Sequence, residues 1–212
     1  MKQFSAIFFL TLFGLVGLGG CSGCGAIKRL MYEGPGRADW QKPDQVVAAL
    51  GLEPGDVVAD LGSGGGYFTY PIADAVGETG RVYALDVDES LLAYVASQSE
   101  KRGLPQIETI LAPEDGPGLA DGSVDLIFLS NVFHHLPDQV QYFRNARATL
   151  RSGGRIAVIE VSKDSFPSGH ATPPDEIRSK FEAAGYRLAQ RHEFLERQSF
   201  QIFVVRSDLP EN

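Results

Sequence analysis

The stretch Val57-Val-Ala-Asp-Leu-Gly-Ser-Gly-Gly-Gly-Tyr67 decides the fold class of this chain. Its first five residues form a short apolar run bounded by glycine, which is typical of a buried β-strand. Three alternate glycines follow directly, at 62, 64 and 66, and the next residues have helical periodicity as far as Val76. Glycine lets a backbone take positive φ angles and pass close to a ligand. A strand, a glycine loop and a helix in this order predict a ligand-binding crevice at the carboxyl end of a parallel strand.

Strands and helices alternate along the rest of the chain. We expect helices at 43–50, 67–76, 89–102, 139–150 and 173–184, and strands at 57–61, 82–85, 107–111, 124–130, 155–161, 186–192 and 200–205. Nearly all-apolar strands between helices predict a parallel sheet that is covered on both faces. The last two strands are joined by a short connection, so we expect that pair to be antiparallel. The prediction is one α/β domain at 38–207 with a doubly wound, mostly parallel seven-stranded sheet and an antiparallel C-terminal strand, followed by a tail at 208–212.

Composition excludes several other classes of protein. The chain has 212 residues, of which 43% are hydrophobic, which fits one ordinary globular domain and excludes a disordered chain. A net charge of −8 without any basic run counts against a nucleic-acid-binding surface. Both cysteines, Cys21 and Cys24, lie near the N-terminus, and the four histidines lack metal-ligand spacing. We therefore expect no disulfide framework and no metal site.

The N-terminal leader has the features of a secretory signal. Lys2 precedes an uncharged stretch that reaches Ile27, with an apolar core at 7–16 and small residues before Cys21. A cationic start, a short apolar run and small residues at a cleavage site describe a signal peptide. The tetrad Leu18-Gly-Gly-Cys21 also resembles the lipobox of bacterial lipoproteins, which implies that Cys21 is lipidated. We expect a signal peptide at 1–20, a tether or linker at 21–37, and a lipoprotein anchored in the cell envelope of a bacterium.

An uncleaved membrane anchor is the alternative interpretation of the leader. The uncharged stretch is about as long as the roughly 20 residues that span a bilayer. Lys28 and Arg29 follow it, which would hold the domain on the cytoplasmic face of the inner membrane. Six glycines make the stretch a poor membrane helix and favour the cleaved lipoprotein. Both interpretations predict that the domain is tethered to a membrane.

The acidic residues near the glycine loop indicate which cofactor binds. Asp86 ends the second predicted strand, where a carboxylate can accept both hydroxyls of a ribose. A dinucleotide fingerprint that starts at Gly62 would require glycine at position 67, which is Tyr67. Asp60, at the end of the first strand, would repel a pyrophosphate and attract a cation. S-adenosylmethionine carries an ammonium and a sulfonium, so the pattern favours it over NAD.

These residues resemble those of the class I S-adenosylmethionine-dependent methyltransferases, close to the small-molecule branch that includes the ubiquinone and menaquinone methyltransferases. Four motifs carry the resemblance: the glycine loop with its two acids, and the segments at 120–127, 131–136 and 150–155. The resemblance implies a Rossmann-like methyltransferase fold, S-adenosylmethionine as the cofactor, and a small-molecule acceptor. A lipophilic acceptor would suit the membrane tether.

The resemblance also supplies the candidate site residues. The cofactor-binding candidates are Asp60, Gly62, Ser63, Gly64, Gly66, Asp86, Glu114, Asp115 and Asn131. The family often places an acid after the third strand to meet the adenine amino group. Pro113 takes that place here, which leaves Glu114, Asp115 or the backbone for the role.

Three histidines are candidates for catalysis. His134 and His135 follow the fourth predicted strand at its carboxyl end, and His170 lies between the fifth strand and the last helix. Methyl transfer requires in-line placement and a deprotonated acceptor, so a catalytic histidine is not obligatory.

Three functions are consistent with the sequence. The first is a methyltransferase that acts on a small molecule, and the second is a catalytically silent S-adenosylmethionine-binding module at the membrane. Formation of S-adenosylhomocysteine separates these two. The third, an NAD-dependent oxidoreductase, is weakened by Tyr67 and by the lack of a recognisable Ser/Tyr/Lys catalytic set.

Overall fold

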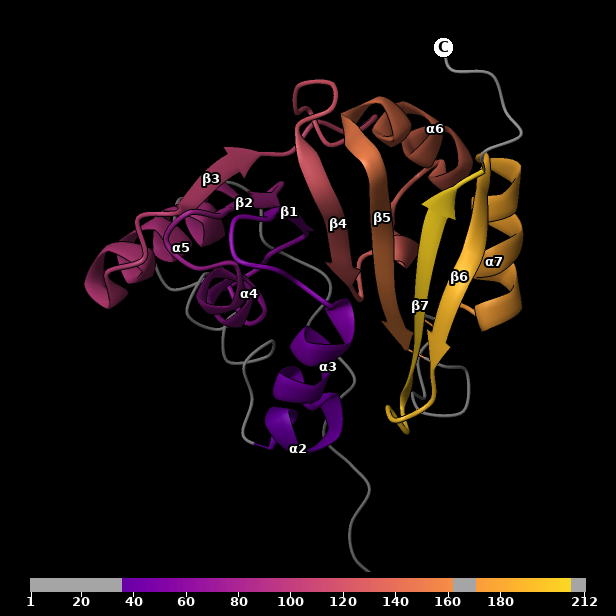
Figure 1. The fold of residues 1–212 in the computed structure, drawn as a ribbon. Helices are drawn as coiled ribbons and strands as arrows, with labels where there is room; N and C mark the ends of the chain where they lie inside the picture. Colours follow the sequence, from indigo (N-terminus) through magenta and orange to yellow (C-terminus); the bar gives the residue numbers. More distant parts are fainter. Residues whose placement is uncertain (1–35, 162–170, 207–212) are drawn as a thin grey trace, which may run out of the picture.

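The computed structural model describes residues 36–161 and 171–206. The predictions that concern the signal peptide, Cys21, Cys24, His170 and the C-terminal tail lie outside the described residues. The described residues form one mixed sheet with helices on both of its faces (Figure 1).

The elements follow one another in the predicted alternation. The helices are α2 (Arg37–Gln41), α3 (Pro43–Leu50), α4 (Thr69–Val76), α5 (Glu89–Arg102), α6 (Gln139–Thr149) and α7 (Pro174–Ala183), with a 3₁₀ turn η1 (Phe133–His135). The strands are β1 (Val57–Leu61), β2 (Arg81–Asp86), β3 (Ile107–Leu111), β4 (Val124–Ser130), β5 (Leu150–Val161), β6 (Tyr186–His192) and β7 (Gln198–Val205).

The sheet has seven strands in the order β3-β2-β1-β4-β5-β7-β6. The neighbours from β3 to β5 are parallel, whereas β7 runs antiparallel to both β5 and β6. The predicted fold class is confirmed, including the antiparallel C-terminal strand. The strand order reverses between β1 and β4, and this is the point at which open α/β sheets place their ligands.

Alternate residues of the central strands pack against different helix layers. Val58 and Phe128 belong to a buried cluster that contains the apolar residues of α3 and α4. Ala59 and Ile127, which adjoin them in the same strands, belong to a second cluster with the apolar residues of α6 and α7. Because successive side chains of a strand point to opposite faces, burial of both faces explains why these strands are apolar throughout.

The structure differs from the predicted elements in several places, among them the start of β7 at Gln198, two residues before the predicted one. Three other differences have a clear cause. The strand predicted to begin at Arg155 begins at Leu150, because Leu150 pairs with Val124 and a register shift absorbs the Ser-Gly-Gly segment within the strand. Helix α4 begins at Thr69, two residues later than predicted, since the turn of the glycine loop extends to Phe68. Helix α2 was not predicted, because five residues are too few to show a helical period.

Candidate functional site

A cavity of about 660 Å³ opens at the carboxyl ends of β1, β2 and β4. Eight of the predicted site residues line it: Asp60, Gly62, Ser63, Gly64, Asp86, Glu114, Asn131 and His135. Gly66, Asp115 and His134 lie outside its lining. The cavity also has lining residues that sequence reasoning missed, among them Arg37, Val87, Leu91 and Tyr142. The structure therefore has a cavity at the glycine loop, where the sequence predicts a ligand-binding crevice.

The glycine loop is held against β2 by its own backbone. The N–H groups of Gly62 and Ser63 both donate to the carbonyl oxygen of Leu85, at 2.7 and 2.9 Å. Gly62 has a φ of 69°, and a Cβ added there would lie 2.2 Å from Cγ2 of Val132. Val132 is β-branched and also lines the cavity, so a side chain at position 62 would displace the opposite wall. Glycine is required here both for the backbone conformation and for space.

The Asp86 carboxylate lies on the cavity wall and organises two loops. Its Oδ2 accepts a hydrogen bond from the N–H of Gly64 at 2.8 Å, and its Oδ1 accepts one from the N–H of Asp88 at 3.0 Å. Each carboxylate oxygen has two lone pairs, so both can accept a further donor from the cavity. Val87, beside it, is 73% exposed and lines the same cavity, so an apolar surface adjoins the paired acceptors. This arrangement fits a ribose diol next to a flat apolar base.

Asp60 lies deeper, at the end of β1. Its Oδ2 accepts a hydrogen bond of 2.6 Å from the hydroxyl of Thr69. Burial, with a contribution from the negative charge of Asp86, raises the pKa of Asp60 to about 7, against the hydrogen bond from Thr69 and the positive charge of Arg37. The ionised form of Asp60 is therefore destabilised by its surroundings, and a cation bound in the cavity would stabilise it.

Two buried hydroxyls face the same cavity without a hydrogen-bond partner among the described residues. They are Oγ of Ser63 and Oη of Tyr67. Buried polar atoms are satisfied in most native proteins, so orphaned atoms that line a cavity indicate a polar ligand. The guanidinium of Arg37 lies 3.8 Å from the centre of the Tyr67 ring and also lines the cavity. A carboxylate at 60 and a guanidinium from α2 fit the ammonium and carboxylate of an amino acid.

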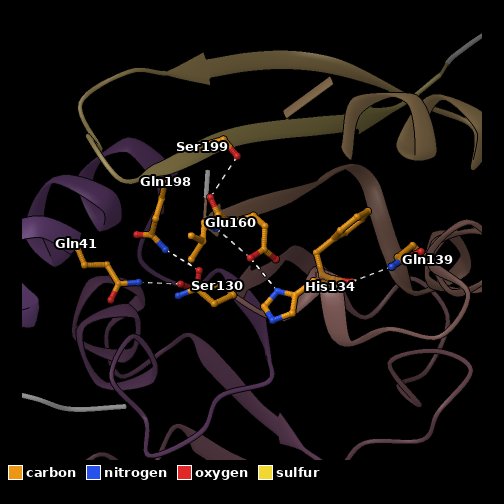
Figure 2. Close-up of polar contacts among 10 residues, drawn as sticks. Gln41, Ser130, His134, Gln139, Glu160, Gln198 and Ser199 are labelled. Carbon is orange, nitrogen blue, oxygen red and sulfur yellow. Dashed lines mark hydrogen bonds and ion pairs between the residues drawn. The ribbon is translucent and has the colours of Figure 1, made fainter. Parts of the chain in front are cut away.

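Helix α2 is held at this position by a buried side chain. Gln41, which is fully buried, donates from Nε2 to Oγ of Ser130 at the end of β4, at 3.0 Å (Figure 2). Gln41 also accepts a hydrogen bond from Arg37 within α2. These contacts bring the first described helix to the cavity. Sequence reasoning missed Arg37 because it follows a Gly/Pro-rich segment without periodicity.

His134 and His135, the two predicted catalytic histidines that the structure describes, are neighbours with different contacts. His135 lines the cavity, whereas Nδ1 of His134 lies 2.9 Å from Oε1 of Glu160, near the end of β5 (Figure 2). Glu160 is fully buried, and this burial raises its pKa to about 7. Sequence reasoning missed Glu160, although a charged residue in the apolar run RIAVIEV was a visible signal. Asn131, with a φ of 57°, accepts a hydrogen bond of 2.8 Å from Gln198.

Among residues 36–161 and 171–206, no group of three or more His, Cys, Asp or Glu side chains is placed to hold a metal ion. None of the helices that the structure describes is long and apolar enough to cross a membrane.

Comparisons with known proteins identify the family of this chain. A family model described as a methyltransferase domain matches residues 52–200. A ubiquinone/menaquinone biosynthesis C-methyltransferase of Francisella philomiragia is 30% identical over 129 residues, or 60% of this chain and 51% of that protein. An arsenite methyltransferase of Halobacterium salinarum is 28% identical over 131 residues, or 61% of this chain and 34% of that protein. A SAM-dependent methyltransferase structure from Aquifex aeolicus superimposes with a TM-score of 0.74 at 26% identity and covers 85% of this chain and 98% of that one.

The fold and the site together define a class I methyltransferase domain. The chain belongs to the methyltransferase domain family, and the cofactor of this family is S-adenosylmethionine. The aligned part of this chain spans about half or less of the length of the curated relatives it matches.

Substitution of Gly62 tests the glycine loop. We expect Gly62→Ala to lower the affinity for S-adenosylhomocysteine more than tenfold, or at least about 1.4 kcal/mol, because the added Cβ displaces Val132. Gly153→Ala is the matched control, since Gly153 also has a positive φ but no atom within 4 Å of the added Cβ. Calorimetry that finds equal affinities for the two folded variants would contradict the assignment of Gly62 to the wall that binds the cofactor.

Binding of the cofactor should release a proton from Asp60. Since its pKa is raised to about 7, Asp60 is largely protonated in the free protein at pH 6. A bound ammonium favours the ionised form, so binding expels the proton, and affinity rises with pH until about 7 and then levels off. Calorimetry of S-adenosylhomocysteine binding in two buffers of different ionisation enthalpy measures this release. Asp60→Asn should abolish it, and an equal release from that variant would exclude Asp60 as the source.

Proposed function

We propose that this chain is an active methyltransferase that transfers the methyl group of S-adenosylmethionine to a small-molecule acceptor. The observation that carries the proposal is the arrangement around one cavity of the glycine loop, Asp60, Asp86 and the two orphaned hydroxyls. When bound, S-adenosylmethionine supplies a methyl group made electrophilic by the positive charge on sulfur. The protein supplies binding, orientation and exclusion of water.

Each part of the cavity has a role in this proposal. Asp86 accepts hydrogen bonds from the ribose hydroxyls, and the loop that contains Gly62, Ser63 and Gly64 passes close to the ligand. Val87 and Leu91 would hold the adenine, and Glu114, which lines the same cavity, would accept from its amino group. Asp60 and Arg37 hold the ammonium and the carboxylate of the methionine part. Asn131 and His135, which line the cavity at the end of β4, are then left for the acceptor side of the site.

Among small molecules, a phenol- or hydroquinone-type acceptor is favoured over arsenite. The two relatives above are named for quinone biosynthesis and for arsenite. Arsenite is a soft electrophile that thiolates bind, and residues 25–212 contain no cysteine. The walls of the cavity toward β4 and α6 include Val132, Leu136 and the ring of Tyr142, which suit an apolar ring. This acceptor class also agrees with a domain that is tethered to a membrane.

The tether belongs to the same proposal. The leader with Cys21 is proposed to anchor the domain as a lipoprotein in the bacterial cell envelope, where lipophilic acceptors are concentrated. An exported domain would require a supply of the cofactor outside the inner membrane, whereas an uncleaved anchor that places the domain in the cytoplasm would not. The two forms differ in the mass of the mature chain.

Turnover separates an active enzyme from a silent binding module. We expect the purified chain to form S-adenosylhomocysteine with a short-chain demethylmenaquinol analogue, detected by mass spectrometry.

Asp86→Ala should weaken cofactor binding at least tenfold, on the order of 1.4 kcal/mol, through loss of the ribose hydrogen bonds. S-adenosylhomocysteine should raise the melting temperature of the wild-type protein, and NAD should not. Cofactor binding without product from this acceptor or a panel of other phenols would instead support the silent module.

Processing of the leader tests the tether. We expect the chain purified from bacterial membranes to begin at a lipidated Cys21, and Cys21→Ala to remain an unprocessed, unlabelled precursor. Intact-mass analysis that finds Met1 to Ile27 still attached to the wild-type protein would contradict the lipoprotein and favour the anchored cytoplasmic enzyme.

A further inference from the structure

A buried acidic residue interrupts the apolar run of β5 just before its carboxyl end. Glu160 is 0% exposed and stands between Ile159 and Val161, which are also buried. An ionised carboxylate is costly to bury unless it is paired and hydrogen-bonded. Apolar packing does not explain why a carboxylate is buried at this position of the sheet.

Two donors converge on one oxygen of this carboxylate. Oε1 of Glu160 accepts from the N–H of Val161 at 3.0 Å and lies 2.9 Å from Nδ1 of His134. Oε2 is buried and has no hydrogen-bond partner among the described residues. The backbone N–H groups of His134 and Phe133 also favour the ionised form of this carboxylate. The ionised carboxylate can only accept hydrogen bonds, so Nδ1 of the neutral imidazole must carry the proton that it donates. The lone pair of the ring is then on Nε2, which is the tautomer that a general base requires.

The pair lies beside the cofactor cavity, on the side toward β5. His134 and Glu160 are joined across the ends of β4 and β5, and Figure 2 shows the second ring nitrogen of His134 pointing away from Glu160. The side chain of His134 is 14% exposed, whereas Glu160 is inaccessible. The centre of the His134 ring is 4.0 Å from that of His135, which lines the cavity. A molecule at the β4 end of the cavity is thus next to His135, whose ring lies against that of His134, whereas Glu160 is inaccessible to it.

We infer that His134 is the proton acceptor for the hydroxyl group of the methyl acceptor, and that Glu160 is its positioning residue. This inference rests on the proposed function. The O–H bond of the acceptor breaks and its proton moves to Nε2 of His134. The electron pair that is released, on oxygen or on a conjugated ring carbon, forms the new bond to the methyl group. When a ring carbon is methylated, its C–H proton then leaves and the carbonyl oxygen takes up a proton, which restores the hydroquinone ring. The S–CH₃ bond breaks with its electron pair on sulfur, which leaves neutral S-adenosylhomocysteine and an imidazolium beside the Glu160 carboxylate.

Few other charges bear on Glu160. The titratable groups near it are His134 and His135, both on η1, and the positive charge of a protonated His135 favours the carboxylate. Strand β7 contributes Ser199, whose hydroxyl lies 3.5 Å from the carbonyl oxygen of Glu160. Because burial raises the pKa of Glu160 to about 7, the carboxylate is protonated in acid and then no longer favours an imidazolium. Activity of the wild type should therefore fall below about pH 7.

The experiment compares Glu160→Gln and His134→Gln with Glu182→Gln, a control acid on α7 that pairs with exposed Arg178. Each variant is assayed with the short-chain demethylmenaquinol analogue from pH 5.5 to 9. We expect kcat to fall roughly 100-fold in the first two variants, the usual scale for a general base, with KM and S-adenosylhomocysteine affinity within about twofold of wild type. The acidic limb of the pH profile should move to lower pH in Glu160→Gln, because only the protonation of His134 then remains and no carboxylate favours it. Glu182→Gln should behave as wild type.

Two further readouts exclude a structural role. A more acidic hydroquinone, already ionised at the assay pH, needs no base and should restore most of the rate of His134→Gln. In ¹⁵N NMR of histidine-labelled protein, the pH at which His134 takes up its second proton should fall in Glu160→Gln. This second readout requires no acceptor.

The outcomes separate the inference from the proposed function. Product formed at an unchanged kcat by Glu160→Gln, loss of cofactor affinity in parallel with kcat, or an identical His134 titration in wild type and Glu160→Gln would each overturn the inference and leave the methyltransferase proposal intact. A wild-type protein that binds S-adenosylhomocysteine but methylates no hydroquinone would contradict the proposed acceptor class, and the inference with it.

Discussion

Burial of the central strands on both faces is the constraint on which the rest of this structure depends. The inner residues of β1, β4 and β5 contact helix layers on either side. A polar side chain at these positions would be buried away from water, so nearly all of them are apolar. Polar and charged groups gather where the strands end. At the reversal of strand order, the loops after β1, β2 and β4 diverge and leave a cavity. The same packing that stabilises the sheet therefore concentrates the chemistry at one edge.

Two carboxylates depart from this rule, and both lie at that edge. Asp60, at the end of β1, and Glu160, near the end of β5, are buried, and burial raises the pKa of each to about 7. Charged groups that are buried at a cost and have shifted pKa values cluster at functional sites. Asp60 faces the cavity that we assign to a cationic cofactor, and Glu160 faces a histidine beside it. In our account, one carboxylate is stabilised by the charge of the cofactor and the other by an imidazolium formed during the reaction.

The fold could be predicted almost completely from the sequence, because strands buried on both faces and glycines at strand ends are local signals. The bounds of β1 at 57–61 and of α5 at 89–102 were predicted to the residue. The start of β5 was not, because it depends on the pairing of Leu150 with Val124, which no local pattern reveals. The cavity wall made by Gly62, Asp86 and Asn131 was also foreseen from motifs. Arg37 and Glu160 were missed, since their roles depend on contacts with Tyr67 and His134 from other parts of the chain.

The most direct test of the central claim is a crystal structure of this chain with S-adenosylhomocysteine. Our account predicts the ribose hydroxyls within hydrogen-bonding distance of the Asp86 carboxylate, the ammonium near Asp60, and the sulfur directed toward Asn131 and His135 at the end of β4. A ligand bound elsewhere on the domain, or in this cavity with its ribose away from Asp86, would contradict the account.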